Sequence, residues 1–329
     1  MSHVHTALEE LIGSEVSLSS PQISQGSKSH NYIRQILGNK SETMPGFPRL
    51  LVDADFLSGS YARGTKNYPL DDIDVMMVMD GTGLFAWSKG QLLDAEVNGT
   101  GERSNPILRH LDHRNILSSK KVLQLFHDAL KKSHPSSRIS KDNQAVNVWL
   151  ESYKLGIDIV PAFHIQPRNG AQDLYYIPAG GEDEGWLKTN PKVDSRISEM
   201  FVQKHGEDFK NLVRLIKYWN DVYNAGRLRS YHLETVIWYV FINHEGRIAN
   251  YEQGLRYFFQ NCAKFLTGPC PDATQIGDPV DRYLNPASRS LSLQRVETVC
   301  KALRSAELSN ILKPGSGISY WGRIFNKSW

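Results

Sequence analysis

Residues 56–81, FLSGSYARGTKNYPLDDIDVMMVMDG, constrain the fold of this chain more than any other segment. The second half of the segment is an apolar run that begins with two aspartates one residue apart, Asp72 and Asp74. Apolar strands usually exclude carboxylates, because an ionised carboxylate loses its hydration when it is buried. In a strand, residues i and i+2 point to the same face. Asp72 and Asp74 are therefore predicted to project together, while Asp71 and Ile73 point the other way.

Paired carboxylates of this kind predict a metal site. Two carboxylates side by side repel each other, and one takes up a proton unless a cation neutralises the pair. Ligation by oxygen alone suits Mg²⁺ or Mn²⁺. Asp158, in the later apolar segment KLGIDIVPAF, is a third candidate ligand if its strand pairs beside residues 72–79. The alternative is a strand aspartate that faces solvent or caps a turn. Three carboxylates that hold two ions are the arrangement of two-metal phosphoryl transfer.

A Gly-Ser pair, Gly59 and Ser60, ends a short apolar segment upstream of the aspartates. A glycine at a turn from a strand to a helix lets backbone N–H groups approach a phosphate, and the N-terminus of the following helix favours negative charge. The Ser60 hydroxyl would add a donor. Alone, the pair would be an ordinary turn, but in combination with the aspartates it predicts phosphate binding. Arg63, next to this turn, could bind phosphate or pair with a nearby acid.

The order of the segments predicts two domains. The chain has 329 residues, enough for more than one core. Strand-like segments such as QAVNVWLES and LYYIP accompany one amphipathic helix up to about residue 180, and helical patterns dominate afterwards. The stretch SSPQISQGSKS, rich in Ser, Gln and Gly, predicts a loop before a helix over residues 30–37. We predict a catalytic core over residues 1–185 and a helical domain over 186–329, with the boundary in the loop 180–192.

Composition excludes several classes of protein. The net charge of +3, with 40% hydrophobic and 22% charged residues, is ordinary for a soluble globular chain. No apolar run approaches the roughly 18 residues of a membrane span. The first residues, MSHVHTALEELIG, lack the basic region and apolar core of a secretory signal. The three cysteines form no CxxC or paired Cys/His pattern. We expect a cytoplasmic protein without a membrane partner or a structural zinc site.

Together these motifs resemble the signature of the DNA polymerase beta-like nucleotidyltransferases: a Gly-Ser turn, a short spacer, a D-x-D pair and a third Asp on a later strand. The segments GSYARGTKNYPLDDIDVMMVM and IDIVPAF are similar to the bacterial cGAS/DncV-like nucleotidyltransferases (CD-NTases), which make cyclic oligonucleotide signals in anti-phage defence (CBASS). The resemblance continues in WLKTNP, LVRLIKYW and SYHLE. It implies an α+β fold: a polymerase beta-like core, a mixed sheet with flanking helices, plus a C-terminal α-helical domain, with the active site in the cleft between them.

The resemblance also implies roles for the residues of the motifs. Asp72, Asp74 and Asp158 would be the catalytic metal ligands for two Mg²⁺ ions, with Mn²⁺ as a substitute. Asp158 would be the aspartate best placed to activate the acceptor hydroxyl. Gly59 and Ser60 would hold the phosphates of the donor nucleotide.

Residues of the helical part would complete the nucleotide pocket. Lys217 and Ser230 would contact the donor phosphates, and Tyr231 would stack on the base. Judged by residue type alone, other roles stay open: Ser230 could cap a helix, and Tyr231 could be an ordinary core aromatic. Asn190, in KTNP, could either read a base edge with its amide or cap the helix after Pro191.

We therefore expect an enzyme that condenses nucleoside triphosphates, ATP among them, into a cyclic di- or trinucleotide and releases pyrophosphate. The alternatives are a template-independent linear nucleotidyltransferase, of the CCA-adding or oligoadenylate type, and a nucleotide-binding regulator without turnover. The sequence lacks the Cys/His insertion with which animal cGAS binds DNA, so a nucleic-acid activator is not expected. The expected partners are nucleoside triphosphates, with a downstream effector that binds the product rather than this protein.

Overall fold

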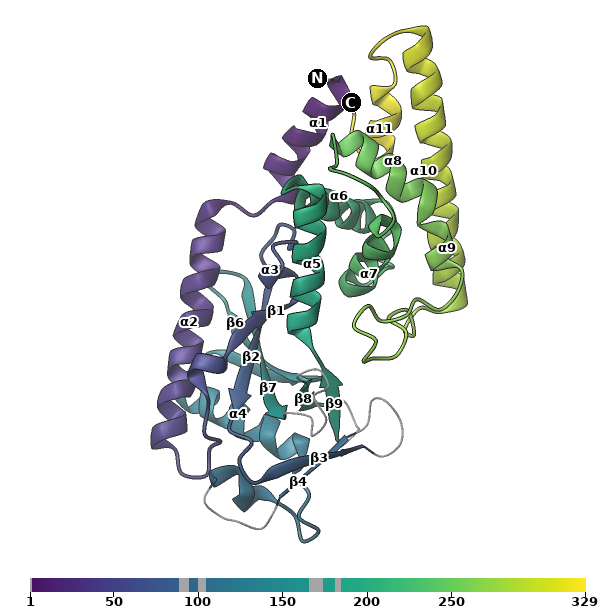
Figure 1. Ribbon diagram of the computed structural model, residues 1–329. Helices are drawn as coiled ribbons and strands as arrows, with labels where there is room; N and C mark the ends of the chain where they lie inside the picture. Colours follow the sequence, from purple (N-terminus) through teal and green to yellow (C-terminus); the bar gives the residue numbers. More distant parts are fainter. Residues whose placement is uncertain (1, 89–94, 100–104, 166–173, 181–184) are drawn as a thin grey trace. The chain divides into compact units, whose positions relative to one another are not determined.

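The computed structural model of the chain describes residues 2–88, 95–99, 105–165, 174–180 and 185–329 (Figure 1). The chain forms two compact units, each assembled from segments that are discontinuous in the sequence. The sheet unit comprises Ser19–Ala62 and Leu70–Val193, and the helical unit comprises Met1–Leu18, Arg63–Pro69 and Asp194–Trp329. Part of the predicted boundary loop, residues 181–184, lies outside the described residues. The division at residues 185 and 186 stays a prediction.

The sheet unit is built on a mixed sheet, for which nine strands fall within the described ranges. The strands are β1 (Phe56–Ser58), β2 (Asp72–Met79), β3 (Leu84–Ser88), β4 (Ala95–Gly99), β5 (Arg138–Asp142), β6 (Ala145–Leu150), β7 (Leu155–Ile165), β8 (Leu174–Pro178) and β9 (Trp186–Thr189). Their order is β1-β2-β7-β8-β9-β4-β3, and β6 pairs with both β5 and β7. The pair β2–β7 is parallel, whereas β1, β6 and β8 join it antiparallel. The predicted mixed sheet with flanking helices is confirmed.

Helices α2 (Ser20–Thr43) and α4 (Ser119–Ser133) contact each other and flank the strands β2 and β7 (Figure 1). Helix α4 is the one amphipathic helix predicted before residue 180, and its apolar stripe is buried, with Phe126 and Leu130 fully enclosed. A Cβ added to Gly26 of α2 would lie 2.8 Å from Leu70 Cδ2 and 3.0 Å from Ile73 Cδ1. This glycine therefore lets α2 approach β2 closely on the face that carries Ile73, which is the face opposite the aspartates.

The predicted loop SSPQISQGSKS is wrong, because α2 begins at Ser20 and includes nearly all of it. Ser19 and Gln22 form a capping box, in which the Ser19 side chain accepts from Gln22 N and the Gln22 side chain accepts from Ser19 N. Pro21 lies in the first turn, where a missing N–H costs nothing. Serine and glycine lower helix propensity, but this cap and packing on the sheet outweigh that local preference.

The aspartate face of the sheet also carries a small apolar cluster. Its buried members include Met76, Val78, Val160 and Tyr175, and Phe56 packs against them. Met76 and Val78 on β2, and Val160 on β7, follow the aspartates at steps of two, and Phe56 pairs with Met76. The carboxylates therefore lie at one end of an otherwise apolar surface, which lowers the local dielectric around them.

The helical unit has a separate core of buried apolar side chains. Its helices are α1 (His3–Leu11), α5 (Pro191–His205, from Asp194 onward), α6 (Asp208–Val222), α7 (Ser230–Phe241), α8 (Tyr251–Asn261), α9 (Ala263–Leu266), α10 (Pro286–Leu312) and α11 (Ile318–Ile324). Val4, Leu8 and Leu11 of α1 pack in this core with α6 and α7, so the beginning of the chain belongs to the helical unit. Nine of the twelve residues of α7 are buried, as its largely apolar sequence predicts.

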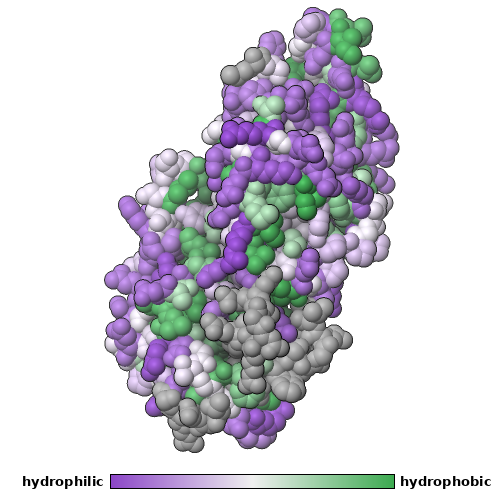
Figure 2. Space-filling model, viewed as in Figure 1, coloured by the Kyte–Doolittle hydropathy of each residue, from purple (hydrophilic) through white to green (hydrophobic). Residues whose placement is uncertain are grey.

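The visible face of the molecule is largely hydrophilic, with small apolar areas between the polar side chains (Figure 2). Such single apolar areas are normal on protein surfaces. Over the described ranges, none of the helices combines the length and the apolar character that crossing a membrane requires.

Candidate active site

The three predicted aspartates lie together on one face of the sheet unit. Asp74 of β2 pairs directly with Asp158 of the parallel strand β7, and Asp72 lies two residues before Asp74 on the same face. One carboxylate oxygen of each aspartate lies within 4.8 Å of the other two, and all three residues are half-buried. The predicted convergence of these side chains is confirmed, and it depends on the register of a strand that lies far away in the sequence.

Gly59 lies at the turn from β1 to α3 (Gly59–Ala62), directly beside this carboxylate cluster. Ser58 pairs with Asp74 across the two strands. The backbone of Gly59 has φ +67°, and a Cβ added to it would lie 1.9 Å from Asp74 Oδ2. Only glycine fits this position, because it tolerates positive φ and leaves room for the carboxylate. The glycine thus has a role in placing Asp74, apart from the predicted approach to phosphate.

Asn147 is a polar residue of the site that our sequence analysis missed. It lies on β6, opposite Asp158, and its Nδ2 donates a hydrogen bond of 2.8 Å to Asp158 Oδ1. A Cβ on Gly156 would lie 2.7 Å from Asn147 Nδ2, so the glycine makes space for the amide. The available signal was a lone amide among apolar residues in AVNVW. Asn147 fixes the orientation of the Asp158 carboxylate.

This cluster fits divalent cations. Three carboxylates at this spacing repel one another, and the charge has to be balanced by protons or by cations. Their oxygens come from two rigid strands and converge on one region, as hard cations such as Mg²⁺ and Mn²⁺ require. Asp72, Asp74 and Asp158 are the residues that would hold such ions.

Lys217 lies in a buried charge cluster of the helical unit. Its Nζ donates to Glu234 Oε1 at 3.1 Å and to the Thr65 carbonyl oxygen at 2.9 Å. Arg63 Nε donates to the other oxygen of Glu234, Oε2, at 2.8 Å. The side chains of these three charged residues are at most 9% exposed. Arg63 therefore pairs with a buried acid, which is one of the two roles left open by the sequence. The contact of Lys217 with donor phosphates stays a prediction.

The electrostatics of this charge cluster centre on Glu234. Burial alone would raise the pKa of Glu234, but the positive charges of Arg63 and Lys217 outweigh burial and hold that pKa below its usual value. Burial lowers the pKa of Lys217, against the attraction of Glu234. Two buried cations share one buried anion, so removal of Glu234 would leave both cations without their counter-charge.

Tyr231, near the start of α7, is held by its hydroxyl group. The hydroxyl lies 2.8 Å from Asp194 Oδ1 and 2.7 Å from Asp272 Oδ1. Burial raises the pKa of Asp194 to about 6, and the like charges of Asp272 and Glu234 act in the same direction. Arg63 lies over the tyrosine ring, 6.0 Å from its centroid. The two carboxyl groups thus fix the orientation of the tyrosine ring. Stacking of Tyr231 on a base stays a prediction.

Two of the residues predicted to contact the nucleotide, Asn190 and Ser230, lie at the starts of helices. Asn190 is buried, and its Oδ1 accepts from Val193 N at 3.4 Å, which caps the first turn of α5. Ser230 is the exposed first residue of α7; the preceding cap residue, Arg229, makes no side-chain cap bond. The reading of a base by Asn190 and the binding of phosphate by Ser230 stay predictions.

The sequence is similar to that of a known bacterial protein over most of its length. No protein-family model matches the chain. A "probable cyclic nucleotide synthase" of Bacillus cereus (strain VD146) is 27% identical over 259 residues, which cover 78% of this chain and 76% of the relative. The chain is a homologue of the bacterial CD-NTases.

Further comparisons agree with this assignment. The "Cyclic AMP-AMP-AMP synthase" of Escherichia coli (strain MS 115-1) is 22% identical over 299 residues, or 83% of this chain and 82% of the relative. Solved structures of E. coli MS115-1 CdnC share the fold: the complex with HORMA-deltaN has a TM-score of 0.68, and the structure with ATP has a TM-score of 0.67. Both are 18% identical and cover at least 98% of each chain. By homology, this CD-NTase homologue is a nucleotidyltransferase of the cyclic nucleotide synthase class.

In this CD-NTase homologue, replacement of Gly59 by alanine is expected to reduce nucleotidyl transfer by a factor on the order of 10². The new Cβ would overlap Asp74 Oδ2, and the positive φ would cost about 1–2 kcal/mol with a side chain present. The measurement is the rate of pyrophosphate release. The matched control is Gly81→Ala, because a Cβ at Gly81 meets nothing closer than 3.8 Å. A wild-type rate in the Gly59 variant would contradict the role of this glycine in placing Asp74.

Proposed function

We propose that this chain condenses nucleoside triphosphates, ATP among them, into a cyclic di- or trinucleotide that serves as a second messenger in bacterial anti-phage signalling. The observation that carries the proposal is the convergence of Asp72, Asp74 and Asp158 on one sheet face. The similarity to bacterial synthases of cyclic nucleotides supports a cyclic product. The E. coli protein that shares the fold was solved with ATP, which supports ATP as one substrate.

In each condensation, the oxygen of an acceptor hydroxyl bonds to the α-phosphorus of a donor triphosphate, and the bond to pyrophosphate breaks. The proton of the hydroxyl leaves toward Asp158, whose orientation Asn147 fixes. Gly59 keeps the turn close to Asp74 and leaves its N–H group near the sheet face, where the donor phosphates would lie. When bound at the aspartates, divalent ions would activate the acceptor oxygen and stabilise the leaving charge.

The remaining predicted residues would complete the pocket. Ser60, Lys217 and Ser230 would contact donor phosphates, Tyr231 would stack on a base, and Asn190 would lie beside a base edge. The sequence led us to expect an effector that binds the product rather than the protein. The comparisons give that expectation no support, because the similar CdnC chain was solved in a complex with a HORMA protein. A direct protein partner is therefore part of what has to be tested.

The test is to identify the product. Purified protein is incubated with Mg²⁺ and the four nucleoside triphosphates, each labelled in turn, and the products are treated with phosphatase. A product that resists phosphatase supports cyclisation, since a ring has no terminal phosphate. If every product is sensitive to phosphatase, the enzyme is a linear transferase of the CCA-adding or oligoadenylate type. No product under any combination, with a folded protein, would favour a nucleotide-binding regulator. A reaction with EDTA in place of Mg²⁺ is the control.

A further inference from the structure

The start of α7 is fastened to the segment between α9 and α10 by two tyrosine hydroxyl groups. The Tyr283 hydroxyl of that segment accepts from Arg229 N at 2.5 Å. The Tyr231 hydroxyl lies 2.7 Å from Asp272 Oδ1 of the same segment, and 2.8 Å from Asp194 Oδ1 of α5. Three parts of the helical unit therefore meet at one phenol group, although Tyr231 as a whole is only half-buried.

The contacts of the Tyr231 hydroxyl require one more proton than this group carries. A phenol has a single O–H donor, and an ionised carboxylate can only accept. Because two carboxyl oxygens lie at hydrogen-bond distance, the hydroxyl donates to one of them. The other contact is a hydrogen bond only if that carboxyl is protonated and donates to the phenol oxygen. With both carboxyls ionised, two acceptors would face each other in a partly buried site, which is unfavourable.

Asp272 is the acid that stays ionised. Its Oδ2 accepts from Gly277 N at 3.0 Å and from the Thr274 hydroxyl, and its Oδ1 accepts from Thr274 N at 3.3 Å. Burial alone would raise the pKa of Asp272, but these donors and the Tyr231 hydroxyl hold that pKa below its usual value. The single proton of the Tyr231 hydroxyl therefore belongs to the bond with Asp272.

Asp194 is the acid that carries the additional proton. Burial raises the pKa of Asp194 to about 6, and the negative charges of Asp272 and Glu234 act in the same direction. The charge of Arg63 acts in the opposite direction, while Lys217 offsets part of the charge of Glu234. Below its pKa, Asp194 is a neutral acid whose O–H group can donate to the phenol oxygen. Above its pKa, that bond is lost.

We propose that Asp194 and Asp272 are positioning residues for the base of the donor nucleotide, and that Asp194 holds the Tyr231 ring as a neutral acid. This role rests on the proposed function, in which Tyr231 stacks on that base. Asp272 accepts the tyrosine proton, Asp194 donates its own, and the two bonds fix the ring. A base binds more tightly to a ring that is already fixed, because less freedom is lost on binding. Affinity for the nucleotide therefore falls as the pH rises through the pKa of Asp194.

The experiment measures binding of a nucleotide whose base reports stacking. The probe is the α,β-methylene triphosphate of 2-aminopurine riboside, with Mg²⁺. It cannot release pyrophosphate, and its fluorescence is quenched when the base stacks on a ring. We expect quenching by the wild-type chain, with a dissociation constant about fivefold higher at about pH 7.5 than at about pH 5.5. In Asp194→Asn the side-chain amide can donate to Tyr231 at every pH, so this dependence should be lost. Titration of the triphosphate itself is common to both proteins.

A double-mutant cycle tests whether Asp194 acts through Tyr231. Tyr231→Phe keeps the ring but loses the hydroxyl, and it should weaken binding roughly tenfold at about pH 5.5. Asp194→Ala should weaken binding in the wild-type background, and should add little in the Tyr231→Phe background. A full additional loss in the double variant would contradict the positioning role. Asp194→Asn, which is of equal size, carries the test if Asp194→Ala does not fold.

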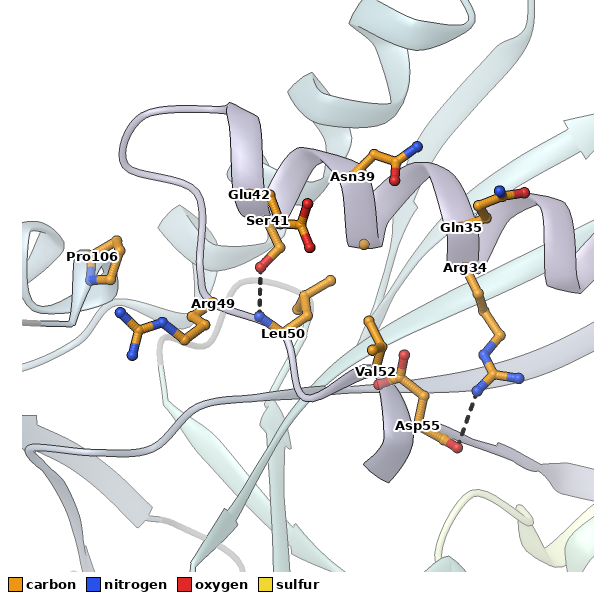
Figure 3. A pocket seen from close by; sticks show the side chains of 11 residues that line it. Arg34, Gln35, Asn39, Ser41, Glu42, Arg49, Leu50, Val52, Asp55 and Pro106 are labelled. Carbon is orange, nitrogen blue, oxygen red and sulfur yellow. Dashed lines mark hydrogen bonds between the residues drawn. The ribbon is translucent and has the colours of Figure 1, made fainter.

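The control for the titration is Asp55→Asn in the sheet unit. Burial raises the pKa of Asp55 to about 6 as well. Arg34 of α2 donates to the Asp55 carbonyl oxygen at 3.2 Å (Figure 3), and Asp55 Oδ1 accepts from Val78 N at 2.7 Å. This variant keeps an oxygen for Val78 N, and Asp55 belongs to a different unit from Tyr231. The wild-type pH dependence of probe binding should therefore persist in it.

Pyrophosphate release from ATP by the wild-type chain is measured alongside, and it decides the proposed function separately. Quenching with the expected pH dependence supports the positioning role even in a chain that releases no pyrophosphate. Absence of quenching overturns the positioning role, whether or not pyrophosphate is released. Equal pH dependence in wild type and Asp194→Asn overturns it too, as does loss of that dependence in Asp55→Asn.

Discussion

Replacement of Asp74 by asparagine is expected to lower the rate of nucleotide condensation by a factor on the order of 10³. Asparagine keeps the shape of the side chain but removes one of the three carboxylates that converge within 4.8 Å. The remaining pair attracts divalent ions more weakly, because each carboxylate contributes a full charge to the site. The measurement is the initial rate of pyrophosphate release at saturating Mg²⁺ and triphosphates.

A second readout separates metal binding from folding. In wild type, Mn²⁺ or Mg²⁺ should raise the thermal unfolding temperature, since a ligand that binds only the folded state stabilises it. In Asp74→Asn this rise should largely disappear, while stability in EDTA should equal or exceed that of wild type, because a repulsion is relieved. Asp71→Asn is the matched control, as Asp71 is exposed next to the pair. Unchanged synthesis in the Asp74 variant would refute the proposed metal site.

Replacement of Glu234 by alanine is expected to lower the free energy of unfolding of the helical unit by about 3–5 kcal/mol. Glu234 is buried and binds both Arg63 and Lys217, at 2.8 and 3.1 Å. Without it, two buried cations lose their counter-charge, and Thr65 Oγ1 loses its acceptor as well. Urea unfolding, followed by tryptophan fluorescence, measures the loss. Glu234→Gln should lose less, because one amide oxygen still accepts hydrogen bonds.

The control for this prediction is another ion pair of the same unit. Glu207 pairs with Lys210 at 2.9 Å, but its side chain is 80% exposed. Exposed pairs contribute about 0–1 kcal/mol, so Glu207→Gln should unfold at nearly the wild-type urea concentration. Suppose that Glu234→Ala unfolds at the same urea concentration as Glu207→Gln, and not at a much lower one. The buried cluster then does not stabilise the helical unit as argued.

Much of the fold follows from local sequence patterns. The alternation around Asp72 and Asp74 predicts their common face, and the apolar stripe of α4 predicts its buried side. These predictions succeed because side-chain direction in strands and helices repeats over a few residues. The loop prediction before residue 30 failed because it rested on composition and not on such a repeat. Composition reports average propensity, whereas a capping box and a glycine contact with the sheet decide where α2 begins.

The candidate site was predicted less completely than the fold. The three aspartates were found because their residue type is unusual in apolar strands. Asn147 and Glu234 were missed, because an amide or an acid in a buried segment has no local pattern that names its partner. Asp194 and Asp272 were missed for the same reason: each reaches Tyr231 from a segment dozens of residues away.

The sequence by itself determined that Asp72 and Asp74 share a face, that a glycine turn precedes them, and that helices dominate after about residue 180. Only the tertiary structure decided that Asp158 lies directly beside Asp74, that Gly59 makes room for the Asp74 carboxylate, and that Glu234 pairs Arg63 with Lys217. The physical reason is that strand register and buried ion pairs arise between segments far apart in the chain. Their energies depend on burial and distance, which the order of residues does not record.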